Sequence, residues 1–435
     1  MSPELIGLIG VILFLLLIFL KIPIAYSMMA VGLVGFGLIV DFKAAFSMIA
    51  TDVFGTFSSY SLSVIPMFVW MGFIAYYSSV GTNLYQFAYR MVGHKKGGLA
   101  IATQLACAIF GAICGSNTAT AATMGAIALP EMRKYHYDDS LSSASVAAGG
   151  ALGILIPPSV IFIVYGIQTE QSIGKLFLSG IIPGILLMLL YMLAIHLVVS
   201  KNPALGPASR KFTWKERFSS LQNGLLEVIF TFAVSLGGLF AGWFTPTEAG
   251  AVGTASILFI TIVRKQLNWK GFKDSLLATI RTTAMIMLIV GGAVAFGRFI
   301  AVSRLPFALA TWASSLALPA VVVLGIILVI YLILGCVIDA LAMILLTIPI
   351  FYPVVVGVLG YDPIWFGVII VMVVALGVIT PPVGMNVFII KGVVKDLPVE
   401  TIFKGVWPFV VAISICIALL ILFPGIATFL PSIIK

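Results

Sequence analysis

Long apolar runs recur along the whole chain, and short charged stretches separate them. Most runs approach the roughly 20 residues that a helix needs to cross a lipid bilayer. They are continuous rather than alternating, which is typical of spanning helices and excludes a membrane β-barrel. The pattern therefore predicts an all-α polytopic membrane protein. The expected spans are 4–20, 24–40, 61–79, 141–167, 175–199, 223–243, 247–263, 276–297, 363–390 and 404–430.

The charged stretches predict which ends of the spans face the cytoplasm, because Lys and Arg gather there. Lys21 follows the first run and an acidic flank precedes it, the reverse of a secretory signal peptide. We therefore expect a retained first span with its N-terminus outside. Asp41 and Asp52 then fall outside, and so do Arg298 and Arg304, which fit the rule poorly. The clusters expected inside are 90–96, 133–134, the linker 200–218, 264–273 and 391–395.

Composition agrees with this class of protein. Of 435 residues, 61% are hydrophobic and only 9% are charged, and the mean hydropathy is +1.20. The net charge of +9 follows from the basic clusters between spans, so no nucleic-acid partner is expected. The four cysteines stand singly in apolar stretches and are expected to be buried and reduced. The three histidines lack metal-ligand spacing, so no transition metal is expected.

The polar stretch "GSNTATAAT" (115–123) interrupts one apolar region. The segments on either side, 99–114 and 118–130, are short for spans and lie between two basic clusters that both belong inside. This arrangement favours a re-entrant helical hairpin that enters from the cytoplasm and has its tip near the middle of the membrane. Irregular backbone at that depth is stable only where it is buried in protein or lines a cavity.

The second half of the chain repeats these features. "LGILIPPS" (152–159) matches "LGVITPPV" (376–383) at an offset of 224 residues (376 − 152). A second short pair, 319–335 and 340–356, surrounds "LGCVIDALA" and occupies the place of the first hairpin. Five expected crossings separate the two hairpins, so the second enters from the opposite face. Inverted repeats with matched Gly and Pro breaks indicate a transport site near the midplane.

The residues at these breaks suit a dehydrated monovalent cation. Two successive prolines open a helix for about a turn and free the carbonyls at 153–156 and 377–380. Free carbonyls in a membrane need a partner. The first tip offers neutral hydroxyl and amide oxygens, and the second tip carries the carboxylate of Asp339, an acid that is costly in lipid unless it is functional or paired. Such oxygen ligands suit Na⁺, and the helix N-termini after Thr118 and Asp339 suit an anion.

We therefore predict two Na⁺ sites and a substrate site. The alternative for each hydroxyl or glycine is close helix packing, as in Gly111-xxx-Gly115 and Gly149-xxx-Gly153. A plain kink for the prolines and a structural role for Asp339 also remain open. The first Na⁺ site comprises Ser116, Asn117, Thr118, Gly153, Ile156, Pro157 and Ser159. The second comprises Gly335, Asp339, Gly377, Thr380, Pro381, Gly384 and Asn386. The substrate site comprises Asn117, Thr120, Pro158, Pro382 and Asn386.

The chain resembles the large membrane subunit of TRAP (tripartite ATP-independent periplasmic) transporters, the DctM-like permeases. The resemblance covers essentially the full length. The second hairpin departs from the serine-asparagine-threonine pattern, which implies a chemically different site. The stretches that carry the resemblance are "GSNTATAATMGAIALPEM" (115–132), "ALGILIPPSVIFIVYG" (151–166), "FTPTEAGAVG" (244–253) and "ALGVITPPVGMNVFIIKGV" (375–393).

The resemblance implies a function that the residues alone do not. It implies Na⁺-driven import of an organic acid, such as sialic acid or a C4-dicarboxylate, across the bacterial inner membrane by an elevator mechanism. The partners would be a small four-helix membrane subunit (Q), a periplasmic binding protein (P) and membrane lipid. The related divalent-anion/sodium symporters, which act without a binding protein, are the alternative. A passive channel and an intramembrane enzyme are weaker rivals, because the hairpins would block a pore and no nucleophile with a base lies within the spans.

The same reasoning divides the chain into scaffold and transport elements. Scaffold helices are expected at 1–80 and 223–297, and a scaffold span with the basic linker at 175–222. The transport elements of the first repeat are 81–174, with hairpin 1 at about 99–131 and a broken helix at about 141–167. Those of the second repeat are 298–395, with hairpin 2 at about 319–356 and a broken helix at about 363–390. A C-terminal helix is expected at 396–435.

Overall fold

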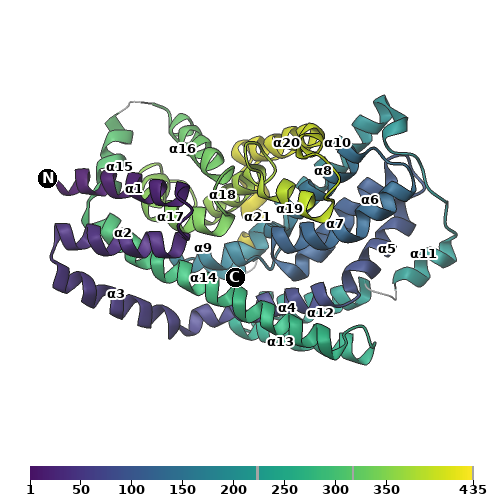
Figure 1. Ribbon diagram of the computed structural model, residues 1–435, viewed down its shortest axis with the longest axis horizontal. Helices are drawn as coiled ribbons and strands as arrows, with labels where there is room; N and C mark the ends of the chain where they lie inside the picture. The colour runs from purple at the N-terminus through teal and green to yellow at the C-terminus, as the bar shows by residue number, and fades with distance from the viewer. Residues whose placement is uncertain (222–224, 316–317, 434–435) are drawn as a thin grey trace.

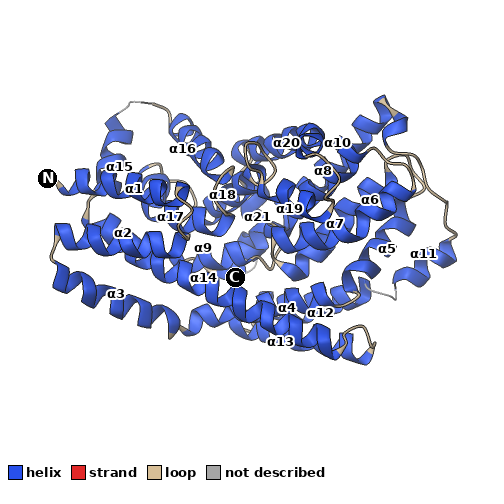
Figure 2. Cartoon of the chain, in the orientation of Figure 1, coloured by secondary structure: helices blue, strands red, loops and turns tan. Residues whose placement is uncertain are grey.

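The computed structural model describes residues 1–221, 225–315 and 318–433, and within these ranges the chain is almost entirely helical, with no strand (Figures 1 and 2). Helices satisfy most of their backbone groups within their own segment, which a lipid environment demands. The helices of the first half are α1 (Pro3–Phe19), α2 (Ile24–Ile39), α3 (Phe42–Phe57), α4 (Val64–Tyr77), α5 (Val80–Val92), α6 (Gly98–Cys114), α7 (Asn117–Lys134), α8 (Asp139–Ala151), α9 (Val160–Gln168) and α10 (Ile173–Lys201).

The second half follows a short linker helix, α11 (Trp214–Ser220). One π-helical stretch, Pro353–Val358, extends the second hairpin beyond α17. The remaining helices are α12 (Leu226–Phe240), α13 (Pro246–Val263), α14 (Trp269–Val302), α15 (Leu305–Ser315), α16 (Ala320–Gly335), α17 (Ala340–Tyr352), α18 (Pro363–Gly377), α19 (Met385–Val393), α20 (Val399–Leu422) and α21 (Gly425–Ile433).

The two halves repeat one order of elements. Helix α5 begins at residue 80 and α15 at residue 305, an offset of 225 (305 − 80), and α8 and α18 begin at 139 and 363, an offset of 224 (363 − 139). Helix α14 takes the place of α3 and α4 together, which a short 3₁₀ turn at Tyr60–Ser63 separates. In Figure 1 the hairpin α6–α7 lies in the right half of the view and α16–α17 in the left half. The inverted repeat with two hairpins and two broken helices is confirmed.

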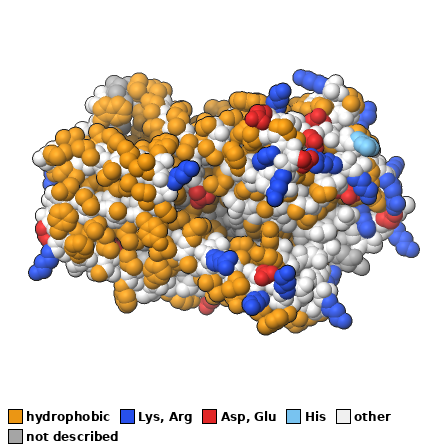
Figure 3. Space-filling view, viewed as in Figure 1, with side chains coloured by type: hydrophobic (Ala, Val, Ile, Leu, Met, Phe, Trp, Pro, Cys, Tyr) orange, Lys and Arg blue, Asp and Glu red, His pale blue; other side chains and the backbone are white. Residues whose placement is uncertain are grey.

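Within the described ranges, six helical segments are long and apolar enough to cross a membrane: Tyr60–Tyr77, Ile173–Lys201, Pro246–Val263, Trp269–Val302, Ala340–Val358 and Val399–Leu422. The hairpin arm α6 and the half-helix α18 are shorter, with 17 and 15 residues. Helix α18 is buried along almost its whole length, so it forms part of the protein's interior and not of its lipid-facing surface. Exposed large hydrophobic side chains cover α1–α3 instead, in the left part of Figure 3.

The structure corrects the sequence prediction at four places. The stretch after Asp41, expected to lie outside between two spans, forms helix α3, whose first turn is capped by the Asp41 carboxylate. The span expected at 276–297 is the much longer α14. Helix α15 was not expected at all, and the single span expected at 404–430 is two helices that end and restart around Phe423 and Pro424. The expected start of a span at 223 lies outside the described residues.

Asp52 and Arg298, two charged residues expected outside, form an ion pair. Arg298 of α14 contacts the carboxylate of Asp52 of α3, with its Nε 2.7 Å from Asp52 Oδ2. Asp52 is almost completely buried, so its charge depends on this partner. The contact agrees with the prediction that both residues lie on the same side of the membrane. It also gives a structural reason for an arginine at position 298, which fits the charge rule poorly.

The basic linker is docked against the base of hairpin 1. The backbone N–H of Gly97 donates to Gly206 O at 2.8 Å, and that of Asp138 donates to Leu205 O at 3.0 Å. Arg217 lies 3.3 Å from Nδ1 of His94, and together with burial it lowers the pKa of that imidazole. The linker 200–218 and the segment 90–96 carry Lys and Arg side chains at this end of the molecule, where Figure 3 shows blue side chains at the right.

Candidate functional site

The tip of hairpin 1 is a tight turn between α6 and α7. Gly115 ends α6 in the left-handed conformation (φ 62°), and its lack of a side chain lets Pro158 O come within 2.4 Å of the position that a Cβ would occupy. Ser116 then caps α7: its Oγ accepts from the N–H of Ala119 at 3.4 Å and lies 3.0 Å from Thr118 Oγ1. The predicted tip therefore forms at the predicted residues.

The tip of hairpin 2 is built differently. Asp339 caps α17, and its Oδ2 accepts from the N–H of Leu341 at 3.1 Å. The side chain is half-buried rather than sealed off. A carboxylate at a helix N-terminus is stabilised by the unpaired N–H groups and by the helix dipole. Asp339 thus has a structural role as a cap, and it also faces the space described below.

The first diproline lies in a buried break between α8 and α9. The 3₁₀ turn Leu152–Ile154 ends the first half-helix, and the hydroxyl of Ser159 donates to the freed Ile154 O at 2.6 Å. Ser159 Oγ also caps α9 by accepting from the N–H of Phe162 at 3.4 Å. A hydroxyl oxygen has two lone pairs, so these bonds still leave room for one further contact. Pro157 and Pro158 are joined by a cis peptide bond.

The second diproline has the same bond geometry but a more open setting. Pro381 and Pro382 are also joined by a cis peptide bond, and Pro382 is exposed. The hydroxyl of Thr380 donates to Leu376 O at 2.6 Å. Gly384, in the left-handed conformation (φ 58°), starts α19, and the backbone N–H of Asn386 reaches back to Val378 O at 3.0 Å. Ile154 O at the first break and Leu376 O and Val378 O at the second are thus hydrogen-bonded within the protein.

Each hairpin packs on the broken helix of its own half through a pair of glycines. A side-chain carbon on Gly111 would lie 2.8 Å from Gly153 Cα, and one on Gly377 would lie 2.7 Å from the carbonyl carbon of Gly335. Both members of the first pair are offset by 224 residues from the second (335 − 111 and 377 − 153). Gly153, Gly335 and Gly377, predicted as Na⁺-site residues, therefore serve close packing, the alternative that the sequence left open.

One predicted residue of the second Na⁺ site lies with the first hairpin instead. Asn386 Oδ1 accepts from Asn117 Nδ2 at 3.2 Å, and Asn386 Nδ2 donates to Ala147 O of α8 at 2.9 Å. Asn117 and Asn386 are both buried. The two asparagines assigned to the substrate site are thus in contact, and they join elements from opposite halves of the chain.

A cavity of about 470 Å³ lies between the two hairpin tips. The volume is within the range of roughly 300–1,000 Å³ that is usual for small-molecule sites. Both N-terminal turns, of α7 and of α17, border it, as predicted. From the predicted sites the cavity wall includes Ser116, Asn117, Thr118 and Asp339. It does not include Gly153, Ile156, Pro157, Ser159, Gly335, Gly377, Thr380, Pro381, Gly384, Thr120, Pro158, Pro382 or Asn386.

The opposite wall of the cavity was not predicted. Helix α4 contributes Phe73, Tyr76 and Tyr77, and α14 contributes Thr282 and Met285. Their sequence signal is weak, because aromatic and polar residues near a span's end are also expected at a membrane interface. Among the described residues that line the cavity there is no Lys, Arg or His, and Asp339 is the one charged side chain.

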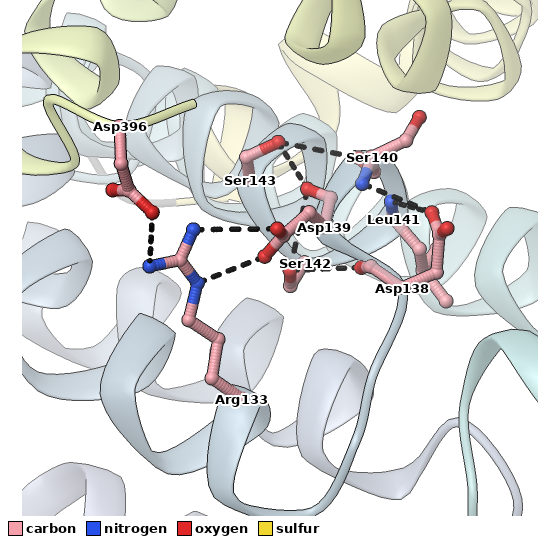
Figure 4. Close-up of polar contacts among 8 residues, drawn as sticks. All are labelled: Arg133, Asp138, Asp139, Ser140, Leu141, Ser142, Ser143 and Asp396. Carbon is pink, nitrogen blue, oxygen red and sulfur yellow. Dashed lines mark hydrogen bonds and ion pairs between the residues drawn. The ribbon is translucent and has the colours of Figure 1, made fainter. Parts of the chain in front are cut away.

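A cluster of charged side chains links the ends of α7, α8 and α19 that lie away from the hairpin tips (Figure 4). Arg133, near the end of α7, contacts Asp139 at the start of α8 with Nε–Oδ1 2.9 Å, and Asp396 after α19 with Nη1–Oδ2 3.0 Å. These groups are a third or more exposed, so each pair contributes little stability by itself. Their arrangement nevertheless links hairpin 1 to both broken helices, as the asparagine pair does in the interior.

Comparisons of the sequence with known proteins place the chain in one family, and a comparison of the structure finds a shared fold. The family described as "Tripartite ATP-independent periplasmic transporter, DctM component" matches residues 11–426. The C4-dicarboxylate TRAP transporter large permease DctM of Pseudomonas aeruginosa is 35% identical, over 88% of this chain and 89% of that protein. The sialic acid TRAP transporter large permease SiaM of Vibrio cholerae is 34% identical, over 95% and 96%. The YdaH transporter of Alcanivorax borkumensis shares the fold (TM-score 0.67, 14% identity, 99% and 100% covered).

Proposed function

Because the chain belongs to the DctM family of TRAP transporter large permeases, we propose that it imports an organic carboxylate into the cell together with Na⁺. The protein is a transporter subunit of the bacterial inner membrane in this proposal. The observation that carries it is the cavity between the two hairpin tips, which is lined by residues with hydroxyl, amide and carboxylate side chains.

Two cation sites follow from the positions of the oxygens. At hairpin 1, the oxygens of Ser116, Asn117 and Thr118 border the cavity beside the first helix break, and they offer neutral ligands to a hard cation. At hairpin 2, Asp339 offers a carboxylate. Na⁺ bound near these groups lowers the cost of bringing an anion into a cavity that has no basic side chain among its described lining residues.

The charge of the side chains that line the cavity indicates which class of substrate it suits. A dicarboxylate would bring two negative charges to a wall whose one charged side chain is already negative. A substrate with one carboxylate and further hydroxyl or amide groups fits the neutral oxygens better. We therefore favour the sialic acid class of organic acid over the C4-dicarboxylate class.

The proposed mechanism is an elevator, in which the hairpins and broken helices move as one body against a scaffold. Internal links support this division: Asn117 to Asn386 and Arg133 to Asp396 join the two halves of the moving body. The opposing wall comes from α4 and α14, which pack closely on each other. A cavity between the two bodies would carry its contents along when one slides.

The proposal includes two protein partners. A small Q membrane subunit would brace the scaffold within the lipid, and a periplasmic P protein would deliver the substrate. The exposed apolar surface over α1–α3 suits contact with lipid or with a membrane partner. The alternative is a transporter that resembles the divalent-anion/sodium symporters and acts without a binding protein.

The test is uptake into proteoliposomes that contain the complex. The panel comprises sialic acid and C4-dicarboxylates, each with and without a Na⁺ gradient and with and without the cognate P protein. We expect accumulation of a monocarboxylate that requires both the gradient and the P protein. Uptake that runs only downhill and ignores Na⁺ would indicate a channel, and uptake that needs no P protein would favour the alternative transporter.

A further inference from the structure

The contact between Asn117 and Asn386 has a fixed direction. A backbone carbonyl can only accept hydrogen bonds, so the Asn386 side chain must turn its Nδ2 toward Ala147 O, 2.9 Å away. Its Oδ1 is then the atom that faces Asn117, and it can only accept. Asn117 must therefore present Nδ2 to Asn386, as observed at 3.2 Å. The carbonyl of Ala147 thus sets the orientation of both amides.

This direction decides which atom of Asn117 is left for the cavity. Asn117 lines the cavity and one hydrogen of its Nδ2 is engaged by Asn386, so Oδ1 is its unbonded acceptor. Within the described residues no donor is hydrogen-bonded to that oxygen. If the amide of Asn117 turned over, two oxygens would face each other at Asn386 and an N–H would point into the cavity. Such a flip would exchange a cation ligand for a group that repels cations.

The packing around Asn386 fixes the place of its side chain. Asn386 is completely buried, and it sits at the start of α19, on the far half of the chain from Ala147. Gly150 of α8 makes room for it, because a side-chain carbon there would lie 3.0 Å from Asn386 Nδ2. A buried amide that is hydrogen-bonded through both its nitrogen and its oxygen is held in one rotamer and one orientation.

We propose that Asn386 is a positioning residue that holds Asn117 with Oδ1 toward the cavity, where this oxygen binds Na⁺. This inference rests on the proposed Na⁺-coupled transport and deepens it. Asn386 itself does not touch the ion: it acts through Asn117, as partners of metal ligands do when they fix a ligand's orientation. The residue that the sequence assigned to the second cation site thereby belongs to the first.

The experiment removes the hydrogen bonds of the Asn386 side chain without leaving a cavity in its place. Asn386→Leu keeps a similar volume but neither donates nor accepts a hydrogen bond. We expect the Na⁺ concentration for half-maximal uptake to rise between about 10-fold and 100-fold, the usual effect of removing a partner that orients a metal ligand. The substrate concentration for half-maximal uptake at saturating Na⁺ should change little.

The chain offers a matched control whose amide donates to the same helix, α8. Gln104 is also completely buried, and its Nε2 donates to Ser145 O of α8 at 2.7 Å, away from the cavity. Gln104→Met removes the same kind of amide–carbonyl bond. It should lower thermal stability to a similar extent while leaving the Na⁺ dependence unchanged. If Asn386→Leu shifts the Na⁺ dependence no more than Gln104→Met does, the proposal is wrong.

A double variant tests whether the two asparagines act as one unit. Asn117→Ala should weaken Na⁺ dependence by itself, and adding Asn386→Leu should then cause no further loss, because there is no amide left to orient. Losses that multiply would show that Asn386 acts independently of Asn117 and would overturn the proposal. If Asn386→Leu does not fold, Asn386→Ala replaces it in both comparisons.

A second readout separates this proposal from the function on which it rests. Na⁺ that binds the folded protein raises its melting temperature in a concentration-dependent manner. A wild-type protein without Na⁺-dependent stabilisation or uptake would refute the proposed function. A wild-type protein with both, beside an Asn386→Leu variant that keeps the wild-type Na⁺ dependence, would refute the positioning role alone.

Discussion

At the scale of single residues, Asp339 combines two tasks that can be separated by mutation. Its Oδ2 caps α17, while the side chain borders the cavity between the hairpin tips. Asparagine caps helices about as well as aspartate does. The cap therefore needs only an oxygen at this position, whereas binding of a cation at hairpin 2 depends on the charge.

We predict that Asp339→Asn leaves membrane insertion and folding intact and raises the Na⁺ concentration for half-maximal uptake by about tenfold or more. The reason is that an interaction with a charged group contributes about 1–2 kcal/mol more free energy than the same interaction with a neutral group. Asp362→Asn is the control, because Asp362 caps α18 in the same way through the N–H of Trp365 but lies away from the cavity. Unchanged Na⁺ dependence in Asp339→Asn would leave Asp339 with only its structural role.

Residue identities were easier to predict than their partners. Ser116, Asn117 and Asp339 stood out because polar groups in an apolar run need a reason to be there. Asn386 stood out too, but its partner lies 269 residues away in the other half of the chain, and no local pattern encodes such a contact. The second wall of the cavity was missed for the same reason, since α4 and α14 carry only ordinary span residues.

At the scale of elements, the breaks were predictable and the additional helices were not. Glycine at a left-handed position and paired prolines act locally, so the turn at Gly115 and the gaps around 155–159 and 378–384 follow from the sequence itself. Helix α3 is less apolar than the helices on either side of it, α15 is less apolar than α16, and neither has a comparable local signal. Whether such a segment is a helix depends on the elements against which it packs.

The glycine pairs that seat the hairpins give a prediction at this scale. Gly377→Ala places a methyl group 2.7 Å from the backbone of Gly335. No side-chain rotation in either segment can relieve this contact. Overpacking of this kind costs roughly 1–3 kcal/mol. We expect a lower melting temperature and at least a severalfold loss of Na⁺-driven uptake, because hairpin 2 no longer fits its broken helix.

Gly325→Ala is the matched control for this substitution. Gly325 lies on α16 of the same hairpin, and a side-chain carbon there would have no heavy atom within 4 Å. A methyl group should improve helix propensity slightly and leave uptake unchanged. Equal effects of the two substitutions on melting temperature and uptake would contradict the close-packing role of Gly377.

At the scale of the whole molecule, the two halves of the chain interlock rather than lie side by side. Each hairpin packs on its own broken helix through glycines, but Asn386 and Asp396 of the second half bind Asn117 and Arg133 of the first. A separate ion pair, Asp52 to Arg298, links α3 to α14. This distribution of contacts is what two bodies that move against each other require, because polar links within a body survive a sliding motion.

The elevator mechanism predicts that a covalent link between the two bodies stops transport. A side-chain carbon on Gly297 of α14 would lie 3.9 Å from Cβ of Pro349 on α17, close to the mean Cβ–Cβ distance of about 3.8 Å in disulfides. Gly297→Cys with Pro349→Cys, in a background without the four native cysteines, should therefore form a disulfide under mild oxidation. We expect uptake to fall to background, Na⁺-dependent stabilisation to persist, and a reducing agent to restore uptake.

A second pair of cysteines, confined to the scaffold, shows whether the link itself or its position matters. The position of a Cβ on Gly291 of α14 lies 4.0 Å from the methyl carbon of Thr56 on α3, so Thr56→Cys with Gly291→Cys joins two elements that we assign to the same body. This link should leave uptake close to that of the reduced protein. The two pairs share α14 and the same chemistry, so a difference between them isolates movement of hairpin 2 along the scaffold. If the oxidised pair at 297 and 349 still transports, hairpin 2 does not slide along α14, and the cavity must open by a local movement of the tips instead.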